Sequence, residues 1–230
     1  MSHARLCTYL IALLVLPLAT TACVNGVNGS VDVPAGSSVS DASTVNGSVT
    51  LEAHAKAGKA TTVNGSIHLA SGAQAGVAHT VNGDITLARD ARIAGDAETV
   101  NGTLSLAAGS VVNGALSNIN GGIEIDDAHV GHGIATVNGN IHITGDAVID
   151  GGIQVEKSGG NDQGDEFFGI HFGGDSNRVP RIVIDAGAIV NGPLTFERPV
   201  KLYISDQAKV AGPISGANAV KFTGAAPPAP

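Results

Sequence analysis

The chain has 230 residues, 12 of them basic and 20 acidic, which gives a formal net charge of −8 at pH 7. Scattered basic residues in an acidic chain give no electrostatic reason to bind nucleic acid. With 3% aromatic residues, no Trp and 32 Gly, the sequence cannot fill a thick core, but it can fill a thin one between stacked coils.

The N-terminal residues 1–22 are predicted to be a cleaved export signal. Arg5 precedes the apolar stretch 6–19, which is too short to span a bilayer and is followed by small residues. The run Thr20-Thr21-Ala22-Cys23 is similar to the lipobox of bacterial lipoproteins, with Thr20 where Leu is usual. This resemblance implies acylation of Cys23, and the alternative is ordinary secretion with an unmodified cysteine.

Acylation of Cys23 would define both the compartment and the redox chemistry of the mature chain. Cys7, the other cysteine, leaves with the signal, so neither a disulfide nor a Cys-type metal site is expected. Several acyl chains, at about 0.8 kcal/mol per buried methylene, would hold the protein on a membrane. We therefore expect a location in the bacterial cell envelope, lipid-anchored, with the outer membrane the first choice.

An internal repeat dominates residues 23–156. The string Thr-Val-Asn-Gly-x-(Ile/Val/Leu)-x-(Leu/Ile) recurs at intervals of 18 or 19 residues. Its asparagines are Asn46, Asn64, Asn82, Asn101, Asn120 and Asn138, with Asn28 as a degenerate earlier copy and Asn191 as a later one. A constant interval of this kind indicates one coil per repeat rather than a series of hairpins.

Each copy is predicted to be a strand with one buried face. Val63, Ile67 and Leu69 share one parity, and His68 lies on the other, which is the period of two typical of a strand. The Asn-Gly pair tolerates left-handed backbone angles and is expected to turn a corner. A second, weaker glycine follows each Asn by 12 or 13 residues, at Gly58, Gly76, Gly95, Gly114, Gly133 and Gly151.

These features predict an all-β fold, a single-stranded parallel β-helix (solenoid) with about 18–19 residues and three short sides per coil. The crossover rule favours a right-handed helix. Equivalent residues of successive strands would lie about 4.8 Å apart. The corner asparagines can then form an amide ladder, in which each side chain donates to the next.

The repeat is interrupted by a predicted inserted loop at 157–180 and resumes in C-terminal coils and a cap at 181–223; a disordered tail, 224–230, follows. The loop holds Phe167, Phe168 and Phe172, three of the five Phe in the chain. They are expected either to pack on the flank of the rod or to form an exposed contact patch for a partner. Bare strand edges at the coil ends would permit self-association.

Residues that could carry chemistry do not form a convincing site in this sequence. His129 and His132 lie near Asp126 and Asp127 but are expected on a solvent-facing turn. The acidic residues of the loop match no calcium-binding motif, and there is no phosphate loop or nucleophile elbow. We therefore predict no catalytic residue, no metal, no cofactor and no enzymatic activity.

The Thr-Val-Asn-Gly-x-Ile-x-Leu repeats, over roughly residues 26–154, resemble the adhesin-like, head-domain type β-helix domains of bacterial envelope proteins. The half-repeat Ala-x-Val-x-Gly-x-Ile also looks like that of bactofilins, which polymerise end to end. These resemblances imply architecture and location, with a non-enzymatic, lipid-anchored structural or adhesin-like rod as the expected function. Its partners would be the membrane and envelope proteins or glycans. The alternative is a carbohydrate-binding or carbohydrate-degrading β-helix protein.

Overall fold

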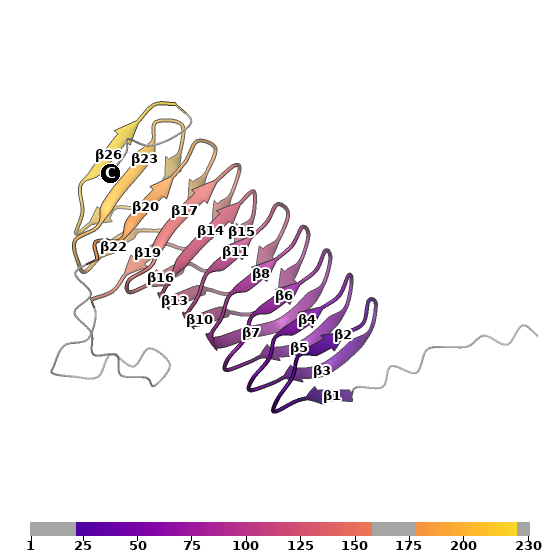
Figure 1. Ribbon diagram of the computed structural model, residues 1–230. Helices are drawn as coiled ribbons and strands as arrows, with labels where there is room; N and C mark the ends of the chain where they lie inside the picture. The colour runs from indigo at the N-terminus through magenta and orange to yellow at the C-terminus, as the bar shows by residue number, and fades with distance from the viewer. Residues whose placement is uncertain (1–21, 158–177, 225–230) are drawn as a thin grey trace, which may run out of the picture.

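The computed structural model describes residues 22–157 and 178–224, in which the chain winds as a parallel β-solenoid of ten coils. Figure 1 shows the coils stacked into a rod, with β1 at one end and β26 at the other. The described residues contain strands and turns but no helix. The predicted fold class is therefore confirmed, while the right-handed sense stays a prediction.

One side of the rod is a ten-stranded parallel sheet to which each coil contributes one strand. We call it sheet B. At about 4.8 Å per strand, its ten strands span roughly 45 Å. In order, its strands are β2 (Val31–Val33), β4 (Val49–Leu51), β6 (Ile67–Leu69), β8 (Ile85–Leu87), β11 (Leu104–Leu106), β14 (Gly122–Asp126), β17 (Asn140–Thr144), β20 (Arg181–Ile184), β23 (Lys201–Ser205) and β26 (Ala219–Phe222).

The other strands form sheet A, which has 16 strands and branches after the third coil. Before the branch the strands are long: β1 (Ala22–Asn25), β3 (Ser38–Ser43), β5 (Lys56–Thr61) and β7 (Gln74–Asn82). One branch holds β9 (Arg92–Ile93), β12 (Val111–Val112), β15 (His129–Val130), β18 (Val148–Ile149), β21 (Ile189–Val190) and β24 (Lys209–Val210). The other holds β10 (Ala97–Asn101), β13 (Leu116–Asn120), β16 (Ile134–Thr136), β19 (Ile153–Val155), β22 (Leu194–Phe196) and β25 (Ile214–Ser215).

The branch arises from one additional residue per coil. Ala75 and Ala78 of β7 are separated by two residues, but their partners Ile93 and Ala97 are separated by three. The extra residue breaks the strand into two sides at Gly95. From Ile93 on, one inward column of sheet A changes from Ala to Ile and Val, and from Leu116 on the other changes from Ala to Leu and Ile, so a wider coil encloses a wider apolar core.

The predicted strand parity is correct in sheet B but wrong for Val63. Ile67 and Leu69 are fully buried and His68 is exposed. Val63, expected on the same buried face, points outward and is exposed. Strand β6 begins only at Ile67, because the chain turns a corner at Asn64, and alternation does not carry across a corner.

A different corner, which follows each strand of sheet B, is a four-residue turn that needs a left-handed residue at its third position. In successive coils this position is held in turn by glycine and by a larger residue, such as His54 and Asp90, which have φ of 59° and 60°. Each of these side chains lies over a glycine of the next coil, so a Cβ on Gly72 would be 2.4 Å from His54 Nδ1 and one on Gly109 2.3 Å from Asp90 Oδ1. The alternation lets bulky residues tolerate this backbone, since the neighbouring coil leaves them space.

Strand β19 ends at Val155 and β20 begins at Arg181, and the two coils meet because Ile141 pairs with Ile182. The predicted signal, except for Ala22, lies outside the described residues. So do residues 158–177 of the predicted loop, which contain Phe167, Phe168 and Phe172, and residues 225–230 of the predicted tail.

Candidate functional site

The corner asparagines form a continuous amide ladder along one edge of the rod. In all six steps the Nδ2 of the later residue donates to the Oδ1 of the earlier one at 3.0 Å. The ladder holds Asn28, Asn46, Asn64, Asn82, Asn101, Asn120 and Asn138. Asn28 therefore belongs to it, whereas Asn191 lies at a different corner, where its Nδ2 donates to Asp150 Oδ1.

A buried column of threonines lies beneath the ladder and joins the coils from inside. Thr62 Oγ1, for example, donates to the carbonyl oxygen of Gly47 in the preceding coil at 2.8 Å. Asn118, which interrupts the threonines in sequence, fills the same place: its Oδ1 accepts from Thr136 Oγ1 at 2.5 Å, and both residues are fully buried. The polar interior of this corner is thereby bonded across successive coils.

The glycine of the Asn-Gly pair is required mainly by the close approach of backbones. The φ angle lies in the left-handed region at Gly29, Gly47 and Gly121, as expected, but not at Gly65, Gly83 and Gly102. A Cβ on Gly83 would lie 2.0 Å from the carbonyl oxygen of Gly65, a separation that real side chains do not adopt. The corner therefore selects glycine for space at most copies, and for its backbone angle at Gly29, Gly47 and Gly121.

The second, weaker set of glycines does not share one register along the rod. The backbone N–H of His132, rather than that of Gly133, donates to Gly114 O. A Cβ on Gly151 would meet the carbonyl oxygen of His132. His132 is therefore the residue in line with Gly114 and Gly151, and Gly133 lies one residue further along the coil.

An outward column of aliphatic side chains runs beside the ladder, one residue before each asparagine. We call it the valine column: Val27, Val45, Val63, Val81, Val100, Ile119 and Val137. Its first three members are exposed, whereas Val100, Ile119 and Val137 are buried and form an apolar cluster separate from the rod's core. The ladder and this column together form one flank, which we call the ladder face.

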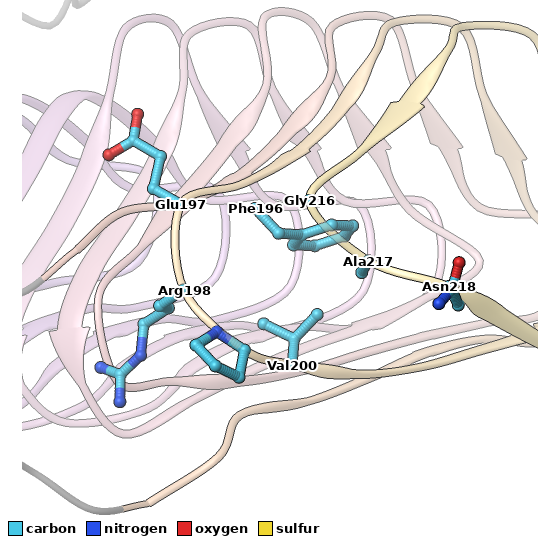
Figure 2. Close-up of a pocket in the computed structure, with 8 residues that line it drawn as sticks. Phe196, Glu197, Arg198, Val200, Gly216, Ala217 and Asn218 are labelled. Atoms are coloured by element: carbon cyan, nitrogen blue, oxygen red, sulfur yellow. The ribbon is translucent and has the colours of Figure 1, made fainter.

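Arg198 closes the ladder at its C-terminal end. Its Nη1 donates to the side-chain oxygen of Asn138 and, at 3.1 Å, to the carbonyl oxygen of Val137. Figure 2 shows the strand connection from which Arg198 and Glu197 project, beside a pocket of about 500 Å³ between the last two coils. Phe196 and Val200 contribute to the pocket lining. Arg198 lies 60 residues from its partner, so no local motif signals it.

Cys23, the predicted lipidation site, lies in β1 at the first coil and is exposed. It pairs with Asp41 of β3, and its Sγ is 3.0 Å from Ser40 Oγ. No residue separates Cys23 from the first strand, because Cys23 is part of it. An acyl group on this sulfur would therefore be attached directly to the end of the rod.

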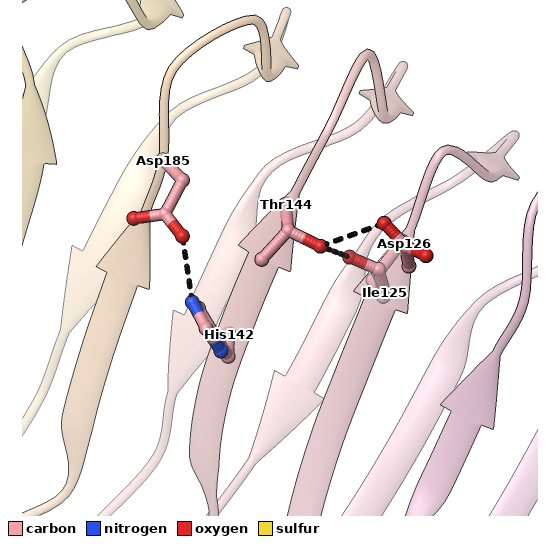
Figure 3. A network of polar contacts seen from close by, with 5 residues as sticks. All are labelled: Ile125, Asp126, His142, Thr144 and Asp185. Carbon is pink, nitrogen blue, oxygen red and sulfur yellow. Dashed lines mark hydrogen bonds and ion pairs between the residues drawn. The ribbon is translucent and has the colours of Figure 1, made fainter. Parts of the chain in front are cut away.

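The outer face of sheet B carries polar contacts between coils, shown in Figure 3. His142 Nε2 and Asp185 Oδ2 are 2.8 Å apart. Thr144 Oγ1 donates to Asp126 Oδ1 at 3.0 Å and lies 3.2 Å from the carbonyl oxygen of Ile125. Further along the same face, Tyr203 packs with Val183 and Phe222, an aromatic cluster that the repeat pattern did not indicate.

His129 lies opposite an acid of the next coil. Its Nε2 is 2.7 Å from Asp150 Oδ2, and this hydrogen bond lowers the pKa of the Asp150 carboxyl group below its usual value. Both side chains are largely exposed, so the pair contributes little to stability. Within residues 22–157 and 178–224, no three His, Cys, Asp or Glu side chains are grouped so that they could hold a metal ion.

The fold and these contacts define the class of the protein: a parallel β-solenoid with an amide ladder. Comparison with family models, with curated proteins and with solved structures finds no match. In the described part of the chain, no helix is long and apolar enough to cross a membrane.

Proposed function

We propose that the protein is a non-enzymatic rod of the bacterial cell envelope, anchored to a membrane by lipid at Cys23. The position of Cys23 carries the proposal. It is exposed, it belongs to the first strand, and it directly follows the lipobox-like run Thr20-Thr21-Ala22. Lipid on this residue would hold the rod by its end, with no linker between the anchor and the fold.

The net charge supports an upright orientation of the anchored rod. Without Arg5, the chain has 11 basic and 20 acidic residues, a net charge of −9. A negative rod is repelled by anionic lipid headgroups, so its long axis would point away from the surface. About 45 Å of stacked coils would then be presented to the surrounding envelope.

The regular outer faces are the surfaces that an adhesin-like or structural rod would offer to envelope proteins or glycans. On sheet B the outward positions of the first seven coils are all polar: Asp32, Thr50, His68, Thr86, Ser105, Glu124 and His142. The likeness of the repeats to adhesin-like head-domain β-helices supports this role, which stays a proposal.

Metabolic labelling with a fatty-acid analogue tests the anchor. The wild-type protein should be labelled and recovered with membranes, and Cys23→Ala should lose both properties. Cys7→Ala is the matched control and should behave as the wild type, because Cys7 belongs to the segment expected to be removed. Equal labelling of Cys23→Ala and the wild type would overturn the proposal.

A further inference from the structure

One inward column of sheet B changes its chemistry at the last coil. Strand pairing links one residue of each of the ten coils into this column. Its first nine members, from Val33 to Ile204, are aliphatic and at most 3% exposed. The tenth is Lys221, which is exposed. A charged residue therefore stands where every preceding coil has a core residue.

The strand that carries Lys221 has an open edge in the part of the chain that the structure describes. Strand β26 lies at the opposite end of the rod from β1 (Figure 1), and its only sheet neighbour among the described residues is β23. Asp206 N–H donates to Phe222 O at 3.0 Å, so the backbone groups of Phe222 point back towards β23. Because backbone groups alternate sides along a strand, those of Ala219 and Lys221 face the open edge. This edge offers donors and acceptors in register for another strand.

The end surface beside Lys221 is apolar. Three other inward columns reach the last coil at Val210, Ile214 and Ala219. Ile214 is 39% exposed, and Val210 and Ala219 are half-buried, whereas their partners in the preceding coil are all buried. A strand added at this end would therefore cover apolar surface as well as pair backbone groups.

This end of the rod also carries the opposite charge from the rest. Residues 22–157 contain 5 basic and 13 acidic residues, a net charge of −8, whereas residues 178–224 contain 6 basic and 3 acidic residues, a net charge of +3. On the last two coils Lys201, Lys209 and Lys221 are exposed. An acidic chain that approaches the rod is therefore attracted to this end and repelled by the remainder.

Lys221 disfavours a second copy of this chain, the occupant that an open coil end would otherwise favour. In a head-to-tail stack, the second copy's Val33 would follow Lys221 in the column and bury its ammonium group beneath an aliphatic side chain. A tail-to-tail pair would bring together two ends of the same positive charge. An inward-facing lysine on an edge strand is a known device against such self-pairing.

We propose that the open edge of β26 binds an extended acidic segment of a partner protein as an additional strand of sheet B. The added strand would place one side chain over Ala219 and, two residues away, another over Lys221. An aliphatic residue fits the first position, and Asp or Glu fits the second, where its carboxylate pairs with the ammonium group. Strand addition takes its affinity from the backbone and its specificity from alternate side chains. The proposal uses only the last coil and does not depend on lipid at Cys23.

Binding of a short peptide to the full chain tests this recognition. The fluorescent probe Thr-Val-Thr-Glu-Thr-Val-Thr has a palindromic sequence, so it suits a parallel or an antiparallel strand, and its anisotropy reports binding. The wild type should bind this probe about fivefold more tightly than a probe with Lys in place of Glu. Lys221→Glu should reverse the preference. Lys56→Glu, the matched control at an exposed position of β5, should leave it unchanged.

Four outcomes would overturn the proposal: no binding of either probe, equal binding of both, a preference that survives Lys221→Glu, or undiminished binding of the Glu probe after N-methylation of its backbone. The comparison of the two probes on the wild type needs no variant, so it decides the question even if Lys221→Glu does not fold. Binding of polygalacturonate in place of both peptides would identify an acidic glycan as the ligand and contradict strand addition.

Sedimentation tests the exclusion of a second copy. The wild type should remain monomeric as its concentration is raised, and Lys221→Leu, which restores the aliphatic column, should self-associate. Self-association of the wild type that Lys221→Glu abolishes would show that a second copy occupies the edge, and would overturn the assignment to an acidic partner.

Discussion

Removing one rung from the middle of the amide ladder should destabilise the rod about twice as much as removing the first rung. Asn82 donates to Asn64 and accepts from Asn101, each at 3.0 Å, whereas Asn28 only accepts from Asn46. A hydrogen bond contributes about 0.5–1.5 kcal/mol net, and the low end applies to exposed side chains. Asn82→Ala should therefore cost about 1–2 kcal/mol and Asn28→Ala about half of that.

Urea unfolding followed by circular dichroism measures both losses. Asn82→Asp adds a test of direction. At pH 7 its carboxylate can accept from Asn101 but cannot donate to Asn64, so one of the two hydrogen bonds is lost and the rod should be less stable than the wild type. Protonation below about pH 4 should restore part of the stability, because a carboxylic acid can donate. Equal losses for Asn28→Ala and Asn82→Ala, or no loss in either, would refute the contribution of the ladder.

Three further perturbations test the packing and the surface. Gly83→Ala should lower the melting temperature strongly, because the added Cβ would be 2.0 Å from a backbone oxygen of the preceding coil. Gly122→Ala should be tolerated, because its Cβ would be 3.5 Å from the nearest atom. Similar melting temperatures of the two variants would argue against close contact between the coils. Ile67→Asp should prevent folding, since it buries an unpaired carboxylate, whereas His68→Asp should have a melting temperature near that of the wild type. Equal losses of melting temperature would contradict the assignment of Ile67 to the inward face and His68 to the outward face. The hydrogen bond with the His129 imidazole lowers the pKa of Asp150 below its usual value of 3.8. The ionised carboxylate therefore stabilises the fold at pH values above 3.8, and this stabilisation is lost as the pH falls through the lowered pKa. Unfolding titrations of Asp150→Asn should accordingly show a deficit of about a few tenths of a kcal/mol at pH 6 that vanishes in acid, and a deficit that grows in acid would reverse the sign.

The period and the inward face of sheet B could be predicted because they repeat with constant spacing. Ile67 and His68 obey simple alternation, and the corner asparagines recur at 18 or 19 residues, so stacking must bring them together. Alternation failed at Val63, because the corner between Val63 and Ile67 resets which side faces inward. The reason for Gly83 was also missed, since the approach of a backbone from the preceding coil leaves no mark in the local sequence.

Contacts that depend on the end of the repeat could not be predicted. Arg198 reaches Asn138 across an interrupted part of the chain, and no periodic pattern links the two. The apolar nature of the ladder face was hidden for a similar reason: a valine before each corner asparagine has the composition of a core residue. Only the geometry of the corner places that valine outside.

The central claim is that the rod is held on a membrane by its first coil, and the distance of each coil from the lipid surface tests it most directly. Acylation would consume the thiol of Cys23, so single cysteines introduced in a Cys7→Ser chain by Asp32→Cys, Thr86→Cys or Glu124→Cys can carry a fluorophore. These positions share the outward column of sheet B, and the second and third lie about 14 and 24 Å along the rod from the first. With a quencher attached to lipid headgroups, quenching should be strongest at 32, weaker at 86 and weakest at 124. Equal quenching at all three positions, or none at any of them, would contradict a rod anchored by its end.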